Sequence, residues 1–139
     1  MSLTSWRYLA GSPKQNGPPF RMIVNNGIPA GMSSDGMQIA PMNPWLHMYY
    51  AVTGKNARGE LINDGQQITR QQVMKLYTAS NGWFLREENQ LGSIEAGKLG
   101  DLVVLNQDYF TVPEEAIKKT SSVMSVVGGK IVHDAGAIK

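Results

Sequence analysis

The sequence contains no cysteine among its 139 residues, which excludes disulfide bonds and thiolate metal sites. It also has little charge, because charged residues make up 17% of the chain and the formal net charge is only +2. Since both signs are mixed and the balance is small, we expect neither nucleic acid nor an anionic membrane surface as a partner.

Long apolar runs are missing as well. No stretch approaches the roughly 20 apolar residues that a membrane-spanning helix needs, and the N-terminus has no apolar signal-peptide core. We therefore expect no membrane segment and a cytoplasmic location. What remains is a globular composition, with 42% hydrophobic residues, in a chain of one ordinary domain length.

Two helices are expected in the first half of the chain. Residues 20–24 predict a short helix that stops at residues 26–27, which are Asn-Gly, a favoured helix end. Asn43 and Pro44 predict the start of a longer helix, with Asn as the N-cap, that should end before Gly54. Its expected apolar face consists of Trp45, Met48, Tyr49 and Val52.

Two capping-box patterns predict further helix starts. Thr69 and Gln72 form one pattern, and Thr111 and Glu114 form the other, which should open a short helix ending near residue 119. Gly82 is expected to weaken the helix that begins after Thr69, because glycine is a poor helix former.

Short apolar runs predict strands. Residues 28–32 are expected to form a buried strand that runs into Ser-Ser-Asp-Gly, and residues 102–105 are expected to form another. Residues 123–127 and 130–133 flank Gly-Gly, which favours a hairpin turn. Because such short strands are unstable alone, residues 102–105 should pair with this hairpin.

Asp35 is the first candidate for chemistry. It follows the predicted strand 28–32 and opens a loop. A carboxylate at the carboxyl end of a barrel strand is well placed for metal ligation or proton transfer. A turn residue that binds its own backbone has the same local pattern, so both interpretations stay open at this stage.

The two histidines, His47 and His133, are far apart and show no ligand spacing. His47 lies off the apolar face of its predicted helix, and His133 ends a hairpin strand. We therefore expect both to be solvated or lightly packed. Ser33 and Ser34 have no histidine nearby, which makes a serine nucleophile an unsupported interpretation.

Two other patterns favour structure over chemistry. Residues 92–98 have the glycine and lysine spacing of a phosphate loop, but Leu99 stands where Ser or Thr should bind magnesium. We expect a tight loop that leads into the strand 102–105. Five aromatic residues could line a pocket, but their helical spacing favours the core. These are Trp45, Tyr49, Tyr50, Trp83 and Phe84.

Five segments form a series along the chain. Residues 27–35 end in Ser-Asp, residues 41–45 are Pro-Met-Asn-Pro-Trp, and residues 68–78 begin Ile-Thr-Arg-Gln-Gln. Residues 91–105 are Leu-Gly-Ser-Ile-Glu-Ala-Gly-Lys-Leu-Gly-Asp-Leu-Val-Val-Leu, and residues 126–132 are Val-Val-Gly-Gly-Lys-Ile-Val. This series resembles the end of enzymes of the amidohydrolase superfamily, in its amidohydrolase-3 branch.

The resemblance implies an α/β fold. Residues 1–90 would hold the last strand and helix of a (β/α)8 metal-dependent hydrolase barrel, and residues 91–139 the C-terminal strands of a composite β-sandwich domain. It also implies a divalent metal, usually zinc. Of the family's ligands only the aspartate of the last strand has a counterpart, Asp35, which would ligate the metal, orient the attacking water and move its proton.

These implications give the expected function. The chain would be the C-terminal portion of a metal-dependent amidohydrolase that hydrolyses non-peptide C–N bonds of amides or cyclic amides. Alone it would be inactive and metal-free, because the histidine ligands have no counterpart here. Its partners would be the remainder of the parent enzyme, a small amide substrate and, for the isolated chain, further copies of itself.

Two alternatives remain from the sequence. One is a small self-contained α+β module that binds a partner through its apolar surface and has no catalytic activity. The other is a small hydrolase that uses Asp35 with a metal supplied across an oligomer interface.

Overall fold

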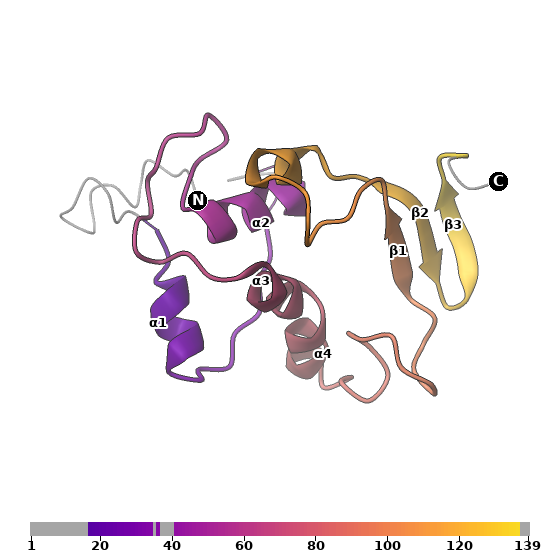
Figure 1. Cartoon of the computed structure of the whole chain (residues 1–139). Coiled ribbons are helices and arrows are strands. Elements are labelled where there is room, and N and C mark those ends of the chain that lie inside the picture. The colour runs from indigo at the N-terminus through magenta and orange to yellow at the C-terminus, as the bar shows by residue number, and fades with distance from the viewer. Residues whose placement is uncertain (1–16, 35, 37–40, 137–139) are drawn as a thin grey trace.

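The computed structural model describes residues 17–34, 36 and 41–136 (Figure 1). The range contains both helices and strands, which fits the expected α/β fold. The elements are α1 (Phe20–Asn25), α2 (Pro44–Thr53), α3 (Arg70–Tyr77), α4 (Ala79–Leu85), β1 (Leu102–Leu105), the 3-10 helix η2 (Glu114–Lys119), β2 (Ser122–Val127) and β3 (Lys130–Asp134).

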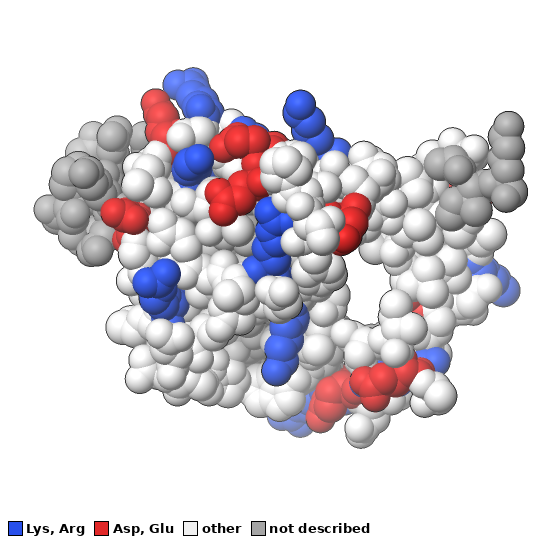
Figure 2. Space-filling view, in the orientation of Figure 1, with Lys and Arg blue, Asp and Glu red and all other residues white. Residues whose placement is uncertain are grey.

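The helices and the sheet lie at opposite ends of the molecule (Figure 1). The three strands form an antiparallel sheet in the order β1-β2-β3. Leu105, at the end of β1, packs against the helical core. The space-filling view nevertheless shows an opening between the sheet and the helical part (Figure 2). The sheet is therefore attached to the helices at its margin and has no helical layer stacked on it within the described range.

Both helices predicted in the first half are confirmed. Asn43 caps α2 by accepting a hydrogen bond from the N–H of Trp45 at 3.0 Å, and Pro44 is its first helical residue. Gly54 ends α2 at a φ of 72°, which glycine adopts without strain. The short helix α1 likewise ends just before Gly27, whose φ is 63°.

The two capping-box patterns have different outcomes. At α3 the box is present, because Thr69 and Gln72 exchange side-chain-to-backbone hydrogen bonds of 2.8 and 3.2 Å. At the second pattern the expected short helix is present and ends at Lys119, but the predicted capping box is absent. The Thr111 hydroxyl instead donates to Asp108 at 2.8 Å, and η2 begins after Pro113 with no side-chain cap. Asp108 lies three residues before Thr111, so its carboxylate can accept the hydroxyl proton within a local turn.

The expected weakening at Gly82 was also wrong. The break between α3 and α4 lies at Thr78, whose φ of −120° and ψ of −90° are not helical. Gly82 is buried inside α4, and a Cβ at this position would approach the carbonyl oxygen of Leu91 to 3.1 Å. The absence of a side chain therefore allows the following loop to pass close to the helix.

The predicted strand over residues 28–32 was wrong. These residues form no ladder with any other described segment, and Ile28 is 52% exposed. The backbone of Met32 is instead held by helices: its N–H donates to the carbonyl of Leu76 at 3.0 Å, and its carbonyl accepts from Asn81 Nδ2 at 3.0 Å. A strand needs a neighbour to pair with, and none of the described residues provides one.

The predicted sheet is confirmed. Val103 of β1 faces Ser125 of β2, and Val127 of β2 faces Lys130 of β3. Gly128 and Gly129 form the hairpin turn with φ values of 58° and 76°, the positive pair that a type I′ turn requires.

The loop expected over residues 92–101 is confirmed. Lys98, the lysine of the phosphate-loop pattern, donates to the carbonyl of Glu88 at 2.8 Å and to the Ser93 hydroxyl at 2.7 Å. No helix follows the loop. Lys98 therefore closes this loop internally and is not directed toward a phosphate.

The core lies between α2, α3 and η2. Arg70 ties α3 to the segment before η2, because its guanidinium donates to the carbonyls of Tyr109 and Val112 at 2.7 and 2.6 Å. The buried apolar side chains are Met48, Tyr49, Ala51, Ile68, Val73, Leu76, Tyr109 and Ile117.

No helix of the described part is both long and apolar enough to cross a membrane.

Two threonines test the capping outcome. Thr69→Ala should lower the free energy of unfolding by about 1 kcal/mol, because it removes a formed N-cap. Thr111→Ala should change it by less than about 0.5 kcal/mol, because its hydroxyl bonds only to an exposed turn residue. Urea unfolding followed by circular dichroism measures both changes. Equal losses in the two variants would contradict the assignment of Thr69 as the only cap of the pair.

Candidate functional site

The segment that leads to the candidate catalytic aspartate is held against α3 and α4. Asp35 itself lies outside the described residues, and of its neighbours Ser33 is exposed and Ser34 half-buried. Met32 carries the two backbone hydrogen bonds to α3 and α4 described above. At Gly31 a Cβ would collide with Asn81 and crowd the ring of Phe84. The backbone therefore passes tightly over α4 shortly before position 35.

Asn81 contacts the segment before position 35, and the sequence did not predict this contact. Its side-chain amide donates to the carbonyl of Met32 at 3.0 Å and to the carbonyl of Tyr77 at 3.3 Å. Asparagine is unfavourable inside a helix unless its side chain has a specific partner. The partner of its side chain lies 49 residues away, so no local sequence signal indicated this contact.

The expectation that His47 is solvated was wrong for its ring nitrogens, although the residue as a whole is only half-buried. Both of its ring nitrogens are buried, and neither has a hydrogen-bond partner among the described residues. Burial lowers the pKa of His47, which favours the neutral imidazole. His133 is exposed on β3, as expected. The part of the chain that the structure describes contains no cluster of three or more His, Cys, Asp or Glu side chains able to hold a metal.

The aromatic residues divide into core and surface. Tyr49 is fully buried, and Trp45 packs against Tyr109 with ring centroids 6.0 Å apart, so the core interpretation holds for both. It was wrong for Trp83 and Phe84, which are 51% and 54% exposed. They stack edge to face on α4, where the described residues cover each of them only in part.

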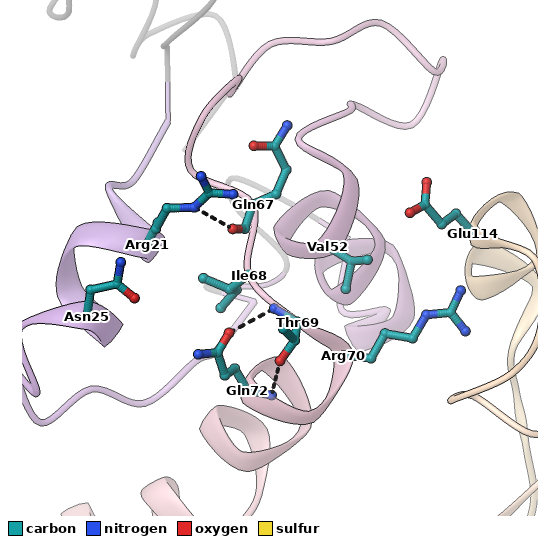
Figure 3. A pocket seen from close by; sticks show the side chains of 9 residues that line it. All are labelled: Arg21, Asn25, Val52, Gln67, Ile68, Thr69, Arg70, Gln72 and Glu114. Carbon is teal, nitrogen blue, oxygen red and sulfur yellow. Dashed lines mark hydrogen bonds between the residues drawn. The ribbon is translucent and has the colours of Figure 1, made fainter.

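A shallow pocket of about 540 Å³ lies where α1, the loop before α3, the start of α3 and η2 meet (Figure 3). Buried Ile68 forms part of its floor. Arg21 is fixed at one side, because its Nε donates to the carbonyl of Gln67 at 3.1 Å. The described lining residues are Arg21, Asn25, Val52, Gln67, Ile68, Thr69, Arg70, Gln72 and Glu114.

The chemistry of this pocket is limited. Glu114 is the one carboxylate among its described lining residues, and no histidine accompanies it. The Arg70 guanidinium already bonds to two backbone carbonyls. The pocket can therefore offer polar contacts, but it has no pair of groups suited to acid–base catalysis.

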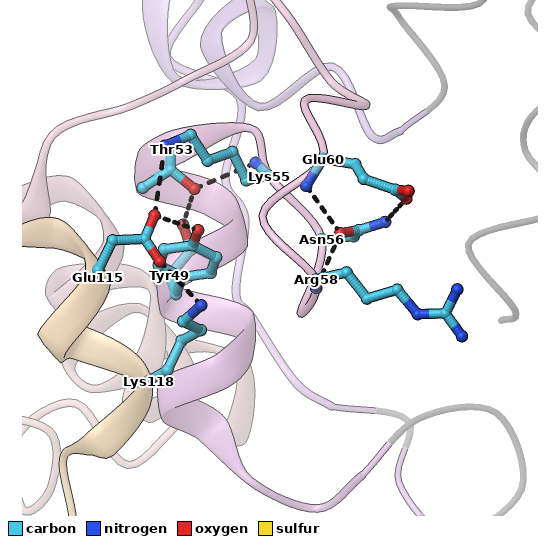
Figure 4. A network of polar contacts seen from close by, with 8 residues as sticks. All are labelled: Tyr49, Thr53, Lys55, Asn56, Arg58, Glu60, Glu115 and Lys118. Carbon is cyan, nitrogen blue, oxygen red and sulfur yellow. Dashed lines mark hydrogen bonds and ion pairs between the residues drawn. The ribbon is translucent and has the colours of Figure 1, made fainter.

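A polar cluster joins α2 to η2 (Figure 4). Glu115 lies at its centre: its Oε1 accepts from the Tyr49 hydroxyl at 2.8 Å and from Lys55 Nζ at 3.3 Å, and its Oε2 pairs with Lys118 Nζ at 2.8 Å. Lys118 also lies 4.6 Å from the centroid of the Tyr49 ring. The partners come from positions up to 66 residues apart, so no local sequence signal indicated the cluster.

This cluster has a clear electrostatic consequence. Hydrogen bonds from Lys118 and Tyr49, with the further contact to Lys55, hold the pKa of Glu115 down to about 2. The same contact raises the pKa of Lys118. Burial, assisted by the Glu115 contact, raises the pKa of Tyr49. A carboxylate that two lysines keep ionised is a poor proton acceptor. The cluster therefore has a structural role, which is to link η2 to α2.

Positive and negative side chains are interspersed over the helical part, while most of the sheet is uncharged on the face that Figure 2 shows. On this face the mixed charges give no single-sign field that would attract a polyanion.

Comparisons with a family model and with curated relatives identify the same family for this chain. The model of the Amidohydrolase family matches residues 4–133. The protein YtcJ of Bacillus subtilis (strain 168), which is named as a presumed amidohydrolase, is 25% identical over 118 residues, covering 83% of this chain and 22% of the relative. The N-substituted formamide deformylase of Arthrobacter pascens is 22% identical over 116 residues, covering 84% of this chain and 21% of the relative.

A solved structure shares the fold. The amidohydrolase from Thermotoga maritima MSB8 superposes with a TM-score of 0.61 at 19% sequence identity, covering 95% of this chain and 34% of that one. The chain thus spans about a fifth of the length of the two curated relatives and about a third of the solved chain.

Glu115 provides a test of the polar cluster. Since the pKa of Glu115 lies near 2 when folded, below its ordinary 4.5, its ionised form stabilises the folded chain above about pH 4.5. That contribution is lost as the pH falls from 4.5 toward 2. Glu115→Gln should therefore be less stable than the wild type at pH 7, and the difference should shrink over this window.

Urea unfolding at several pH values between 7 and 2 measures this difference. Glu114→Gln is the matched control, because Glu114 forms no ion pair with a described residue and should show no such pH-dependent gap. A gap for Glu115→Gln that stays constant between pH 4.5 and 2 would show that the carboxylate charge is not responsible.

Proposed function

Because the chain belongs to the amidohydrolase family, we propose that it forms the C-terminal portion of a metal-dependent enzyme that hydrolyses non-peptide C–N bonds of amides or cyclic amides. The observation that carries this proposal is the family match, which runs over residues 4–133 and so includes Asp35. One relative is named for the deformylation of N-substituted formamides, and a formamide contains such a C–N bond.

Asp35 is the proposed catalytic residue of this portion. Its carboxylate would orient the attacking water and accept the proton that the water loses. The hydrogen bonds at Met32 support this role, because they fix the backbone three residues before Asp35 through both α3 and α4. A group that transfers a proton must be held in position, and rigid helices hold a loop better than neighbouring loops do.

The residues of this chain do not by themselves fit the metal that the family implies. Catalytic zinc usually takes three protein ligands, and the described residues contain no group of three suitable side chains. Asp35 adds one carboxylate. The buried nitrogens of His47 lie on α2, whereas His133 is exposed on β3. We therefore assign the other ligands to the remainder of the longer enzyme and derive no step through the metal.

The sheet supports the proposed division of the chain. We propose that residues 1–90 close the hydrolase barrel and that residues 91–139 supply strands to a composite β-sandwich. One face of the sheet is apolar, because the register places Leu102, Val104, Met124 and Val126 on the same side. All four are only half-buried here, and such a face normally packs against a second layer.

The two alternatives are less well supported. A self-contained binding module without enzyme ancestry leaves the family match unexplained. A small hydrolase with a metal shared between copies would need histidines that are available to that metal. The ring nitrogens of His47 are buried on α2, and one exposed histidine in each copy is a weak ligand set.

Asp35→Asn in the longer enzyme tests the catalytic role. The proposed longer enzyme should lose about 100-fold or more in kcat/KM toward a formamide when Asp35 becomes Asn. Asp64→Asn is the matched control, because Asp64 is an exposed turn residue that accepts from Gly65 N–H. It should leave kcat/KM nearly unchanged. Unchanged activity in Asp35→Asn would remove the catalytic role.

The isolated 139-residue chain should be inactive and hold no stoichiometric zinc after dialysis. Its zinc content by elemental analysis and its amide hydrolysis test this together. Stoichiometric zinc that is lost in Asp35→Ala, accompanied by hydrolysis in the wild-type chain, would instead favour the small oligomeric hydrolase.

The sandwich proposal has its own test. In the longer enzyme a second layer should cover the apolar sheet face and protect the amides of β1 and β2 more strongly than in the isolated chain. Hydrogen exchange followed by mass spectrometry compares the two proteins, with the buried core residues of α2 as an internal reference. Equal protection of β1 and β2 in both proteins would contradict a covering layer.

A further inference from the structure

The outer edge of the sheet is the strand β3. It pairs with β2 on one side, and the order β1-β2-β3 leaves its other side without a partner among the described residues. All five residues of β3 are exposed. In Figure 1 this strand lies farthest from the helices, whereas β1, the other edge strand, faces them. An approaching chain can therefore reach β3 without displacing another element.

The composition of β3 suits pairing in one direction. Ile131 and Val132, near its middle, are 59% and 63% exposed. Lys130 and Asp134 carry opposite charges at its two ends, and neither forms an ion pair with a described residue. An exposed edge strand with free backbone groups and apolar side chains is a template for another strand.

We propose that β3 pairs in antiparallel orientation with β3 of a second copy, which joins two three-stranded sheets across a two-fold axis. Antiparallel pairing reverses the strand, so Lys130 of each copy lies beside Asp134 of the other. The two-fold axis repeats this contact, which gives two complementary charge pairs for one interface. Parallel pairing would instead place like charges together, which is unfavourable.

Self-association of the isolated chain was expected from the sequence. The strand predicted over residues 28–32 cannot supply the interface, because the structure has no strand there. The sheet supplies the only described edge strands, and β3 is the accessible one. The interface concerns the 139-residue chain and does not depend on the proposed catalytic function.

A protective role for the charges of β3 is the competing interpretation. Edge strands often carry lysine and bulges that prevent pairing. The register with β2 shifts between Ser125 and Val126, so β3 contains one extra residue, which limits the length of a new ladder. If Lys130 prevents association, removing its charge should increase the mass. If it pairs with Asp134, reversing its charge should decrease the mass.

Charge exchange separates these interpretations. Sedimentation equilibrium of the wild-type chain should show a monomer–dimer equilibrium that weakens as salt rises. Lys130→Asp alone and Asp134→Lys alone should each weaken the dimer by about tenfold in Kd, because each places like charges together twice. The double variant Lys130→Asp with Asp134→Lys should return the Kd to near the wild-type value. Circular dichroism checks that each variant is folded.

Cross-linking tests the geometry directly, because the chain has no cysteine of its own. Val132→Cys should give a disulfide-linked dimer on mild oxidation, since pairing about the middle of β3 brings the two positions within disulfide reach. Val103→Cys is the matched control, because it is similarly exposed at 55% but lies on β1, and it should remain unlinked. A monomeric wild type, single charge variants with unchanged Kd, or equal cross-linking at both positions would overturn the proposal.

Discussion

The burial of Tyr49 between α2 and η2 is the interaction on which the rest of the structure depends. Its ring is fully buried in the core, and its hydroxyl still finds an acceptor in Glu115 at 2.8 Å. A buried tyrosine without such an acceptor would be costly. The same carboxylate pairs with Lys118 and contacts Lys55. The Glu115 side chain therefore links η2 to α2 and to the loop that follows α2.

That arrangement also fixes the rest of the helical part. The core side chain of Val73 lies on α3, and Arg70 of the same helix bonds to the two carbonyls that precede η2. Because α3 is fixed from both sides, its carboxyl end can hold the backbone of Met32. The positioning of the segment before Asp35 therefore follows from the packing of α2, α3 and η2, and not from any property of that segment alone.

The sheet is held in a different way. It is stabilised by its own ladders and by the Gly128-Gly129 turn, while its apolar face and its outer edge remain without a layer or a neighbour in the described part. A sheet of three strands with one apolar face is stable when that face is covered. The two proposals made above, a second layer over the face and a second copy at β3, therefore concern separate surfaces and do not compete.

The sequence by itself determined what depends on neighbouring residues. Asn43, Gly54 and Thr69 specify helix ends through their own side chains or backbone, and the glycine pair specifies the hairpin, so these predictions were confirmed. The family resemblance was also present in the sequence, because it rests on the order of short motifs. The tertiary structure decided whatever depends on distant partners.

Residues 28–32 are apolar enough for a strand but find helices in place of strand neighbours, and Trp83 and Phe84 have helical spacing but no core to face. The partners of Glu115 come from three segments. Local patterns set the conformation of a few residues, whereas burial and charge pairing need chain segments that only the folded molecule brings together.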